Sequence, residues 1–199
     1  MEPLEHLNTA WDVDRRIVLD SADKLVIVRF SHYEAAPSLH DEDNESSAAD
    51  SSLANTDSDD DETSGKKPIK RKKLESNSNR KLEMKYHTDT LHMDELLTAL
   101  APKVRKYAKI YLVDTTKVTE FNHMYELAHD REPFAVMFFF KGEHIRVDVG
   151  TGNFNKVNFF AFESMDDFLP IVDSAYRAGM LGKTMTTTEK SFSSVSVQR

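Results

Sequence analysis

The chain has 199 residues and a formal net charge of −8, and it contains no cysteine. Its length allows one domain with additional segments. Without cysteine the chain has no disulfides, no thiolate zinc sites, no cysteine nucleophile and no dithiol redox chemistry. The N-terminal MEPLEHLN lacks the basic and apolar regions of a signal peptide, and no run approaches the roughly 20 apolar residues of a membrane span. We therefore expect a soluble intracellular protein that makes no membrane contact.

The first predicted elements are a helix and a strand. Thr9 or Asn8 is suited to cap a short helix. Apolar residues follow at helical spacing at Trp11, Val13, Ile17 and Val18. Residues 24–30 (KLVIVRF) predict a strand. We expect Trp11, the only tryptophan, to pin this helix to the sheet.

Residues 33–84 predict a long disordered insertion. They hold 13 acidic and 8 basic residues, and the stretch from Asp41 to Glu62 has ten acids, no base and only one large apolar residue, Leu53. Such a composition buries too little apolar surface to offset the entropy of ordering. The rest of the chain holds 21 acidic and 18 basic residues, so the folded part is weakly acidic. This argues against a general affinity for nucleic acid but leaves a local basic patch open.

The pattern after the insertion alternates between helices and strands. Met93, Leu96, Leu97 and Leu100 form an apolar helical stripe, residues 108–113 (AKIYLV) predict a strand, and residues 118–127 predict a second helix. The apolar run 134–140 predicts a strand buried on both faces. Residues 144–149 alternate in polarity and predict its antiparallel partner, with Ile145, Val147 and Val149 on one face.

The C-terminal part predicts one more helix and a tail. Ser164 begins a capping pattern, and the apolar positions that follow predict a helix that stops at Gly179. Residues 183–199 are Ser/Thr-rich and aperiodic, so we expect a flexible C-terminal tail after a single domain over residues 1–182.

This order of elements predicts an α/β protein. Strands joined through helices are expected to be parallel, and the tight hairpin is expected to be antiparallel. We therefore predict a thioredoxin-like fold, with a four-stranded mixed parallel and antiparallel sheet, helices on both faces, and the insertion at 33–84.

Several short sequence segments together resemble one protein family. They are LVIVRFSH at 25–32, MDELL at 93–97, IYLVDTTKV at 110–118, FNHMYEL at 121–127, VMFFF at 136–140, HIRVDVGTGN at 144–153 and NKVNF at 155–159. They are similar to the thioredoxin-like, fifteen-kilodalton protein family of the spliceosomal U5 snRNP, the Dim-type family. The chain departs from the family pattern in its insertion and at Phe154, which stands within what is usually a run of asparagines.

The resemblance implies a non-catalytic component of the U5 snRNP and of the U4/U6.U5 tri-snRNP. Such a protein is expected in the nucleus, docked among the large U5 scaffold protein and other tri-snRNP proteins before spliceosome activation. Contact with snRNA would be indirect or local, and no cofactor or small-molecule substrate is implied. The alternative, a thioredoxin-fold oxidoreductase, is disfavoured because disulfide exchange needs a thiolate.

The candidate contact residues follow the predicted hairpin. We interpret them as exposed groups that bind a partner protein, and they are Gly150, Gly152, Asn153, Asn155, Lys156 and Asn158. Backbone amides of the Gly150–Asn153 turn could instead hold a phosphate, but the third glycine of a dinucleotide motif is missing. Sharp-turn geometry alone also explains both glycines.

A group of histidines and acids has competing interpretations. His87 and His92, with Asp89 and Asp94, outline a metal site, but their spacing matches no standard pair of helix ligands. We predict neither a metal site nor catalytic residues.

The insertion carries candidate nuclear-import residues at Lys66, Lys67, Lys70, Arg71, Lys72 and Lys73. This run could also contact RNA phosphates or merely balance the acidic block, which would compete for its lysines. Ser47 and Ser58 have an acid three residues on and are candidate phosphorylation sites.

Overall fold

The computed structural model describes residues 3–32, 69–128 and 130–193. Within them, six strands form one sheet in the order β1-β3-β2-β4-β5-β6. The strands are β1 (Glu5–Leu7), β2 (Leu25–Ser31), β3 (Ala108–Asp114), β4 (Ala135–Phe140), β5 (Glu143–Asp148) and β6 (Met185–Thr187). Every residue of β2 and β4 is buried. The uninterrupted apolar run predicts this for β4, whereas β2 also buries the polar residues Arg29 and Ser31.

The sheet is mixed. β1 and β2 each pair in parallel with β3, whereas β4 is antiparallel to both β2 and β5. β5 therefore runs in the same direction as β2, and the carboxyl ends of β2, β3 and β5 lie at one end of the sheet. β6 pairs in parallel with β5. The four predicted strands are confirmed, and β1 and β6 extend the sheet at its edges because three-residue strands are too short to show a period of two.

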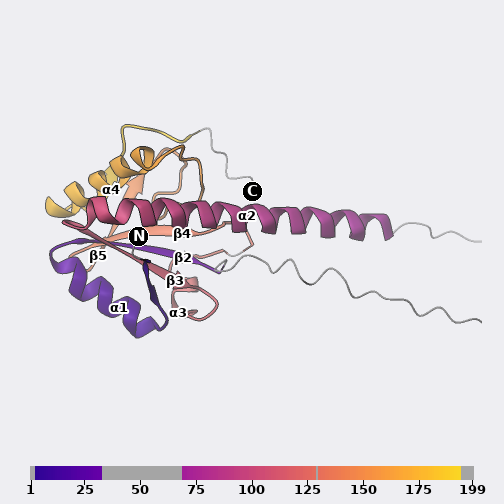
Figure 1. Cartoon of the computed structure of the whole chain (residues 1–199), viewed down its shortest axis with the longest axis horizontal. Coiled ribbons are helices and arrows are strands. Elements are labelled where there is room, and N and C mark those ends of the chain that lie inside the picture. The colour runs from indigo at the N-terminus through magenta and orange to yellow at the C-terminus, as the bar shows by residue number, and fades with distance from the viewer. Residues whose placement is uncertain (1–2, 33–68, 129, 194–199) are drawn as a thin grey trace, which may run out of the picture.

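The helices cover both faces of the sheet (Figure 1). They are α1 (Ala10–Leu19), the 3₁₀ turn η1 (Asp20–Ala22), α2 (Ile69–Val104), α3 (Glu120–Met124) and α4 (Met165–Met180). α2 and α4 pack on one face around Ile27 and Phe138, whereas α1 and α3 pack on the other around Val28 and Phe139. This arrangement confirms the predicted thioredoxin-like fold. None of the described helices is both long enough and apolar enough to cross a membrane.

α1 begins as predicted but buries a different face. The Thr9 side chain accepts a hydrogen bond from the backbone N–H of Asp12 and caps the helix. Val13 and Ile17, one turn apart, are buried against the sheet. Trp11 is two residues before Val13 and therefore lies about 200° around the helix from it. Its side chain is 73% exposed, so the prediction that Trp11 pins the helix to the sheet is wrong.

α2 is longer than its apolar stripe predicts. It begins at Ile69, so residues 69–84, expected in the disordered insertion, are helical, and residues 33–68 lie outside the described part. Only its second half packs on the body: from residue 78 to 85 every residue is exposed, and His87 is the first buried one among those described. The first half projects away from the sheet (Figure 1). After Pro68 the sequence has no glycine or proline until Pro102, so nothing local stops the helix from continuing.

The C-terminal segment is part of the body. The structure differs here from the expected flexible tail over 183–199, because β6 pairs with β5 and Phe192 is buried against Phe159 and Phe162. Residues 194–199 lie outside the described part. α4 starts at the predicted Ser164 cap and ends at Met180. Gly179 lies inside the helix, where an added Cβ would be 2.7 Å from the Phe140 ring, so it serves close packing rather than helix termination.

Candidate docking surface at the carboxyl end of the sheet

The predicted contact residues lie where β5 ends. Gly150 and Gly152 have φ angles of 83° and 82°, in the left-handed region that favours glycine. The Asp148 carboxylate accepts a hydrogen bond from the Gly150 N–H at 2.7 Å and holds the turn. At Gly150 an added Cβ would lie 2.0 Å from the Ser191 hydroxyl, so the C-terminal segment packs directly on this turn. Turn geometry and close packing thus explain Gly150.

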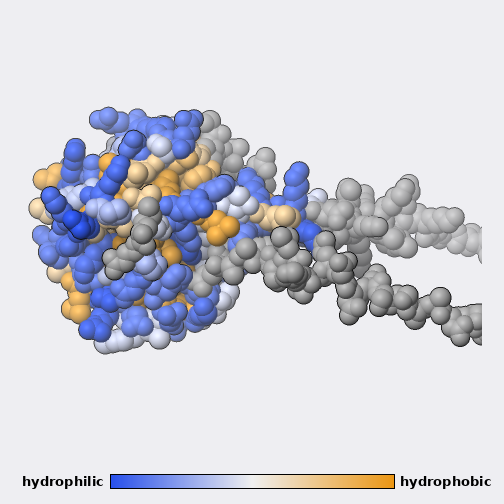
Figure 2. Space-filling model, in the orientation of Figure 1, coloured by the Kyte–Doolittle hydropathy of each residue, from blue (hydrophilic) through white to orange (hydrophobic). Residues whose placement is uncertain are grey.

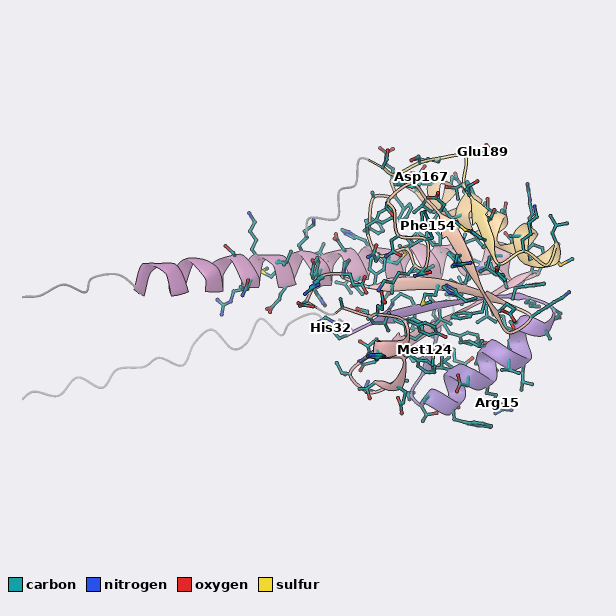
Figure 3. The ribbon with its side chains drawn as sticks, turned by 180° about the vertical axis from the view of Figure 1, so that it is seen from behind. Arg15, His32, Met124, Phe154, Asp167 and Glu189 are labelled. Atoms are coloured by element: carbon teal, nitrogen blue, oxygen red, sulfur yellow. The ribbon has the colours of Figure 1, made fainter. Side chains whose placement is uncertain are left out.

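After the turn, residues 154–157 run back between β4 and β5. The Phe154 carbonyl accepts from Val147 N–H at 3.0 Å, and Val157 forms an antiparallel bridge with Val136. The Asn153 side chain accepts from the Asn155 N–H at 3.1 Å, which fixes the bend between them. Phe154, which is 40% exposed, and Asn155 therefore lie at the surface. Figure 3 labels Phe154. We call Gly152 to Asn155 the docking turn.

Two of the predicted contact residues do not face solvent. Lys156 and Asn158 are 8% and 9% exposed, and both bind the buried carboxylate of Glu132. Lys156 Nζ lies 2.6 Å from Glu132 Oε1, and Asn158 Nδ2 donates to Glu132 Oε2 at 2.8 Å. Lys156 also donates to the Glu126 carbonyl at 2.6 Å. The prediction that Lys156 and Asn158 are exposed contacts is therefore wrong; they connect the docking turn to the loop before β4.

Glu132 is a residue that sequence reasoning missed. It lies 24 residues from Lys156, and no periodicity relates the two positions. The same carboxylate accepts from the Ala128 N–H at 3.1 Å, so it also closes the loop that follows α3. A charged pair buried this deeply is held only when its remaining polar atoms are satisfied, and here backbone carbonyls and an amide satisfy most of them.

His144 holds the docking turn in place through a hydrogen bond. Its Nε2 lies 2.8 Å from the Asn155 carbonyl oxygen, and because a carbonyl only accepts, the imidazole donates from Nε2. The ring packs beside Tyr125 and Phe139. Burial lowers the pKa of His144 below its ordinary value, while the hydrogen bond to Asn155 opposes part of this effect. The neutral imidazole is therefore the form that fits this position.

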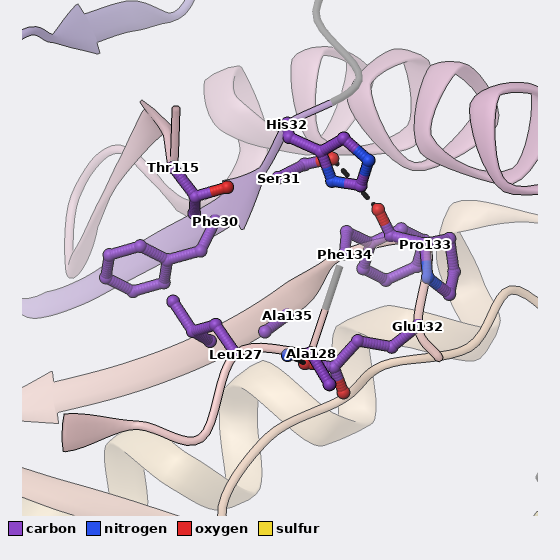
Figure 4. Close-up of a pocket in the computed structure, with 10 residues that line it drawn as sticks. All are labelled: Phe30, Ser31, His32, Thr115, Leu127, Ala128, Glu132, Pro133, Phe134 and Ala135. Carbon is purple, nitrogen blue, oxygen red and sulfur yellow. Dashed lines mark hydrogen bonds between the residues drawn. The ribbon is translucent and has the colours of Figure 1, made fainter. Parts of the chain in front are cut away.

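A small cavity lies at the carboxyl end of β2, just before the start of the insertion in the sequence (Figure 4). Ser31 and Pro133 both line it, and the Ser31 hydroxyl donates to the Pro133 carbonyl at 2.9 Å. The Thr90 hydroxyl of α2 donates to the same carbonyl at 2.9 Å. The cavity encloses about 10 Å³, room for about one water and no substrate. This is the position at which a redox thioredoxin keeps its dithiol, and this chain has no cysteine to place there.

Asp94, one of the residues in the outlined metal group, has a different role. It forms an ion pair with Arg29, which lies on β2 in the centre of the sheet and is 1% exposed. Arg29 Nε donates to Asp94 Oδ1 at 2.7 Å, and Nη2 binds the second oxygen. The pair fixes α2 on the sheet. In the described part of the chain no three histidine or acidic side chains gather as a metal-binding group.

The remaining predicted residues fall on or near the insertion. Lys70, Arg71, Lys72 and Lys73 belong to the first turns of α2. Lys66, Lys67, Ser47 and Ser58 lie outside the described residues.

The fold and this surface define a class: thioredoxin-like modules without a dithiol, whose loops at the carboxyl end of the sheet are held rigid around an exposed turn. Comparison with known proteins gives the particular family. The sequence model of the family described as "Mitosis protein DIM1" matches residues 81–192, more than half of the chain. The chain belongs to this family.

Individual relatives agree with this assignment. The chain is 42% identical over 96 residues to "Spliceosomal protein DIB1" of Eremothecium gossypii, a match that covers 48% of the chain and 64% of the relative. It is 38% identical over 105 residues to "Mitosis protein dim1" of Schizosaccharomyces pombe, which covers 53% and 71%. It is also 38% identical over 108 residues to "Thioredoxin-like protein 4A homolog" of Dictyostelium discoideum, which covers 54% and 65%. The matches span just under two thirds of the first and third of these relatives.

Proposed function

We propose that this chain is a non-catalytic component of the U5 snRNP and of the U4/U6.U5 tri-snRNP, and that it acts in pre-mRNA splicing in the nucleus before spliceosome activation. The observation that carries this proposal is the match to the DIM1 family over residues 81–192, since relatives in it are named spliceosomal proteins. The matched range includes the docking turn and the residues that hold it.

The geometry supports a role in docking. Preorganised loops bind with a smaller entropic cost than loops that must be ordered on contact. The buried contacts of Glu132 with Lys156 and Asn158 keep the docking turn ordered before a partner binds. Phe154 and Asn155 present an apolar ring and an amide to that partner. We propose that this surface meets the large U5 scaffold protein and other tri-snRNP proteins, with snRNA contacted indirectly or locally.

A catalytic role has little support. Disulfide exchange requires a thiolate, and the chain contains no cysteine. Ser31, in the small cavity at the end of β2, directs its hydroxyl to a backbone carbonyl, as a structural hydroxyl does. We therefore expect the purified chain to have no disulfide reductase activity and to need no small-molecule substrate.

The test is co-purification from cells that express the tagged chain. We expect recovery of U5 snRNA and of the large U5 scaffold protein at mild salt. Recovery of the tagged chain without any snRNA would overturn the proposal. A second chain lacking residues 35–84 shows what the insertion and the first half of α2 add together, because the docking turn remains in it.

A surface variant locates the contact. Phe154→Ala with Asn155→Ala removes both exposed side chains of the docking turn and is expected to lower recovery of the scaffold protein severalfold. Asp23→Ala with Lys106→Ala is the matched control, because both residues are exposed at the opposite end of the sheet, before β2 and β3. Equal recovery with both variants would place the contact elsewhere.

Nuclear entry and modification are separate parts of the proposal. We propose that Lys66, Lys67 and the basic residues at 70–73 direct import, so replacing them with glutamine should leave a fluorescent fusion in the cytoplasm. We also propose phosphorylation at Ser47 and Ser58, which mass spectrometry of the native protein would detect; two unmodified serines would contradict it.

A further inference from the structure

The first half of α2 carries an unusual concentration of positive charge. Residues 69–85, which we call the arm, contain seven lysines and arginines and only two acids, Glu75 and Glu83. Outside residues 33–85 the chain holds more acidic than basic residues. An acidic body thus bears one basic helix, and an opposite charge on a partner is attracted to the arm and repelled by the body.

The arm is also the part of the described structure that stands farthest from the sheet (Figures 1 and 3). At about 1.5 Å per residue its 17 residues extend roughly 25 Å. All residues from 78 to 85 are exposed, and Figure 2 shows mostly hydrophilic side chains there, with a small apolar area among them. A ligand therefore has access to residues 78–85 of the arm without displacing any described part of the body.

The apolar residues of the arm do not form a stripe. They are Ile69, Leu74, Leu82 and Met84, at intervals of five, eight and two residues. A helix that docks through a hydrophobic groove presents apolar residues at intervals of three and four. The arm lacks that pattern, so its charge, rather than an apolar face, is what a partner would recognise.

Two lysines of the arm are available for binding. Lys81 and Lys85 lie one helical turn apart and both are exposed. The carboxylate of Asp89, one turn beyond Lys85, interacts with it electrostatically but leaves its ammonium group at the surface. Like charges at this spacing destabilise an isolated helix. A polyanion that neutralises both lysines removes this repulsion and stabilises the arm.

We infer that the arm binds the phosphate backbone of RNA. Lysine and arginine side chains along a helix can neutralise successive phosphates without reading the bases, so this binding is independent of sequence and sensitive to salt. The choice of RNA over DNA rests on the proposed function in splicing, whereas the polyanion site itself follows from the basic composition of the arm and from the exposed Arg80, Lys81 and Lys85. An acidic protein segment is the competing ligand that the test must separate from RNA.

The experiment measures binding of the purified full chain to a fluorescein-labelled, mixed-sequence 20-nucleotide RNA by anisotropy, from 50 to 200 mM salt. The full chain is the stringent form of the test, because its ten acids between Asp41 and Glu62 compete for the same charges. We expect binding that weakens steeply with salt. Each arm charge that neutralises a phosphate should contribute about 0.7 to the slope of log affinity against log salt, so its removal should lower the slope by that amount.

Two triple variants of equal charge change decide where RNA binds. Arg80→Gln, Lys81→Gln and Lys85→Gln together should weaken binding about tenfold or more, since removing one phosphate contact costs severalfold at these salt concentrations. Glutamine keeps helix propensity close to that of lysine and arginine. Arg15→Gln, Lys106→Gln and Lys183→Gln remove three exposed charges from the body instead and should change affinity little.

Three results would overturn the inference: no binding of the full chain at 50 mM salt, an equal decrease in affinity in both triple variants, or a glutamate 20-mer that binds as tightly as RNA. The last result would assign the arm to an acidic protein. Because the assay contains only the chain and RNA, its failure leaves co-purification with the snRNP unaffected.

Discussion

The two halves of α2 belong to one helix but lie in opposite surroundings. From His87 to Val104 the helix buries Met93, Leu97 and Leu100 against the sheet and pairs Asp94 with a buried arginine. From Ile69 to Lys85 it has no buried residue among those whose side chains are described. The packed half is therefore stabilised by tertiary contacts, and the arm is an extension of that nucleus, since adding residues to an existing helix costs far less than starting one.

The body and the arm also differ in how their positive charges are placed. Inside the body, Arg29 and Lys156 are buried and each has a carboxylate partner, so removal of that partner strands a charge in a low-dielectric environment. On the arm, Arg80, Lys81 and Lys85 are exposed, and their removal is expected to change the stability of the fold little. The same residue type thus stabilises the fold in one region and serves recognition in the other.

The largest effect on stability is expected at Glu132. Glu132→Ala leaves the Lys156 ammonium buried without its carboxylate and should lower the free energy of unfolding by about 3–5 kcal/mol. Urea denaturation measures the change. Glu132→Ala combined with Lys156→Met removes both charges and is expected to recover part of the stability. If the double variant is as unstable as the single one, the stranded charge is not the cause.

The next largest effect on stability is expected at a leucine in the packed half of α2, compared with a leucine on the arm. Leu97→Ala removes a fully buried side chain and should destabilise the protein by about 3 kcal/mol, since the cavity adds to the missing burial. Leu82→Ala, on the arm, should change stability by less than about 0.5 kcal/mol. If the two variants unfold at the same urea concentration, the division of α2 into a packed half and an arm is contradicted.

A smaller effect is expected from His144 on acidification. Its pKa is lowered in the folded state, so the unfolded state binds more protons as the pH falls below the ordinary imidazole value of about 6.5. The stability contributed by neutral His144 is present above this pH and is lost as the pH falls through the folded-state pKa, by at most about 1.4 kcal/mol per pH unit for one proton. Unfolding curves of His144→Phe between pH 7.5 and 5 should show a shallower decrease in stability than those of the parent chain.

The smallest effect is expected from the arm charges. Arg80→Gln, Lys81→Gln and Lys85→Gln together should shift the free energy of unfolding by no more than about 0.5 kcal/mol, because these side chains are exposed. The measurement is the same urea titration, and it also shows that any decrease in RNA binding by this variant does not come from unfolding. A larger destabilisation would mean that the arm packs on the body in solution.

The sequence predicts burial correctly where several apolar residues follow one another or alternate with polar ones. β2, β4 and the buried face of β5 follow from their apolar patterns, and Thr9 and Ser164 cap the helices predicted for them. Sequence reasoning failed where one residue has to be placed against another far along the chain. The burial of Lys156 depends on Glu132, and the order of residues 185–192 depends on β5 and on the phenylalanines around Phe192.

The amino-acid sequence by itself determined the alternation of strands and helices, the lack of thiol chemistry and the family-specific motifs around the docking turn. Each of these is a property of neighbouring residues or of the composition. Only the tertiary structure decided which polar residues of that turn reach solvent, which face of α1 is buried, and at which residue of α2 the packing on the body begins. These outcomes depend on contacts between segments distant in sequence, and such contacts become definite only when the sheet brings those segments together.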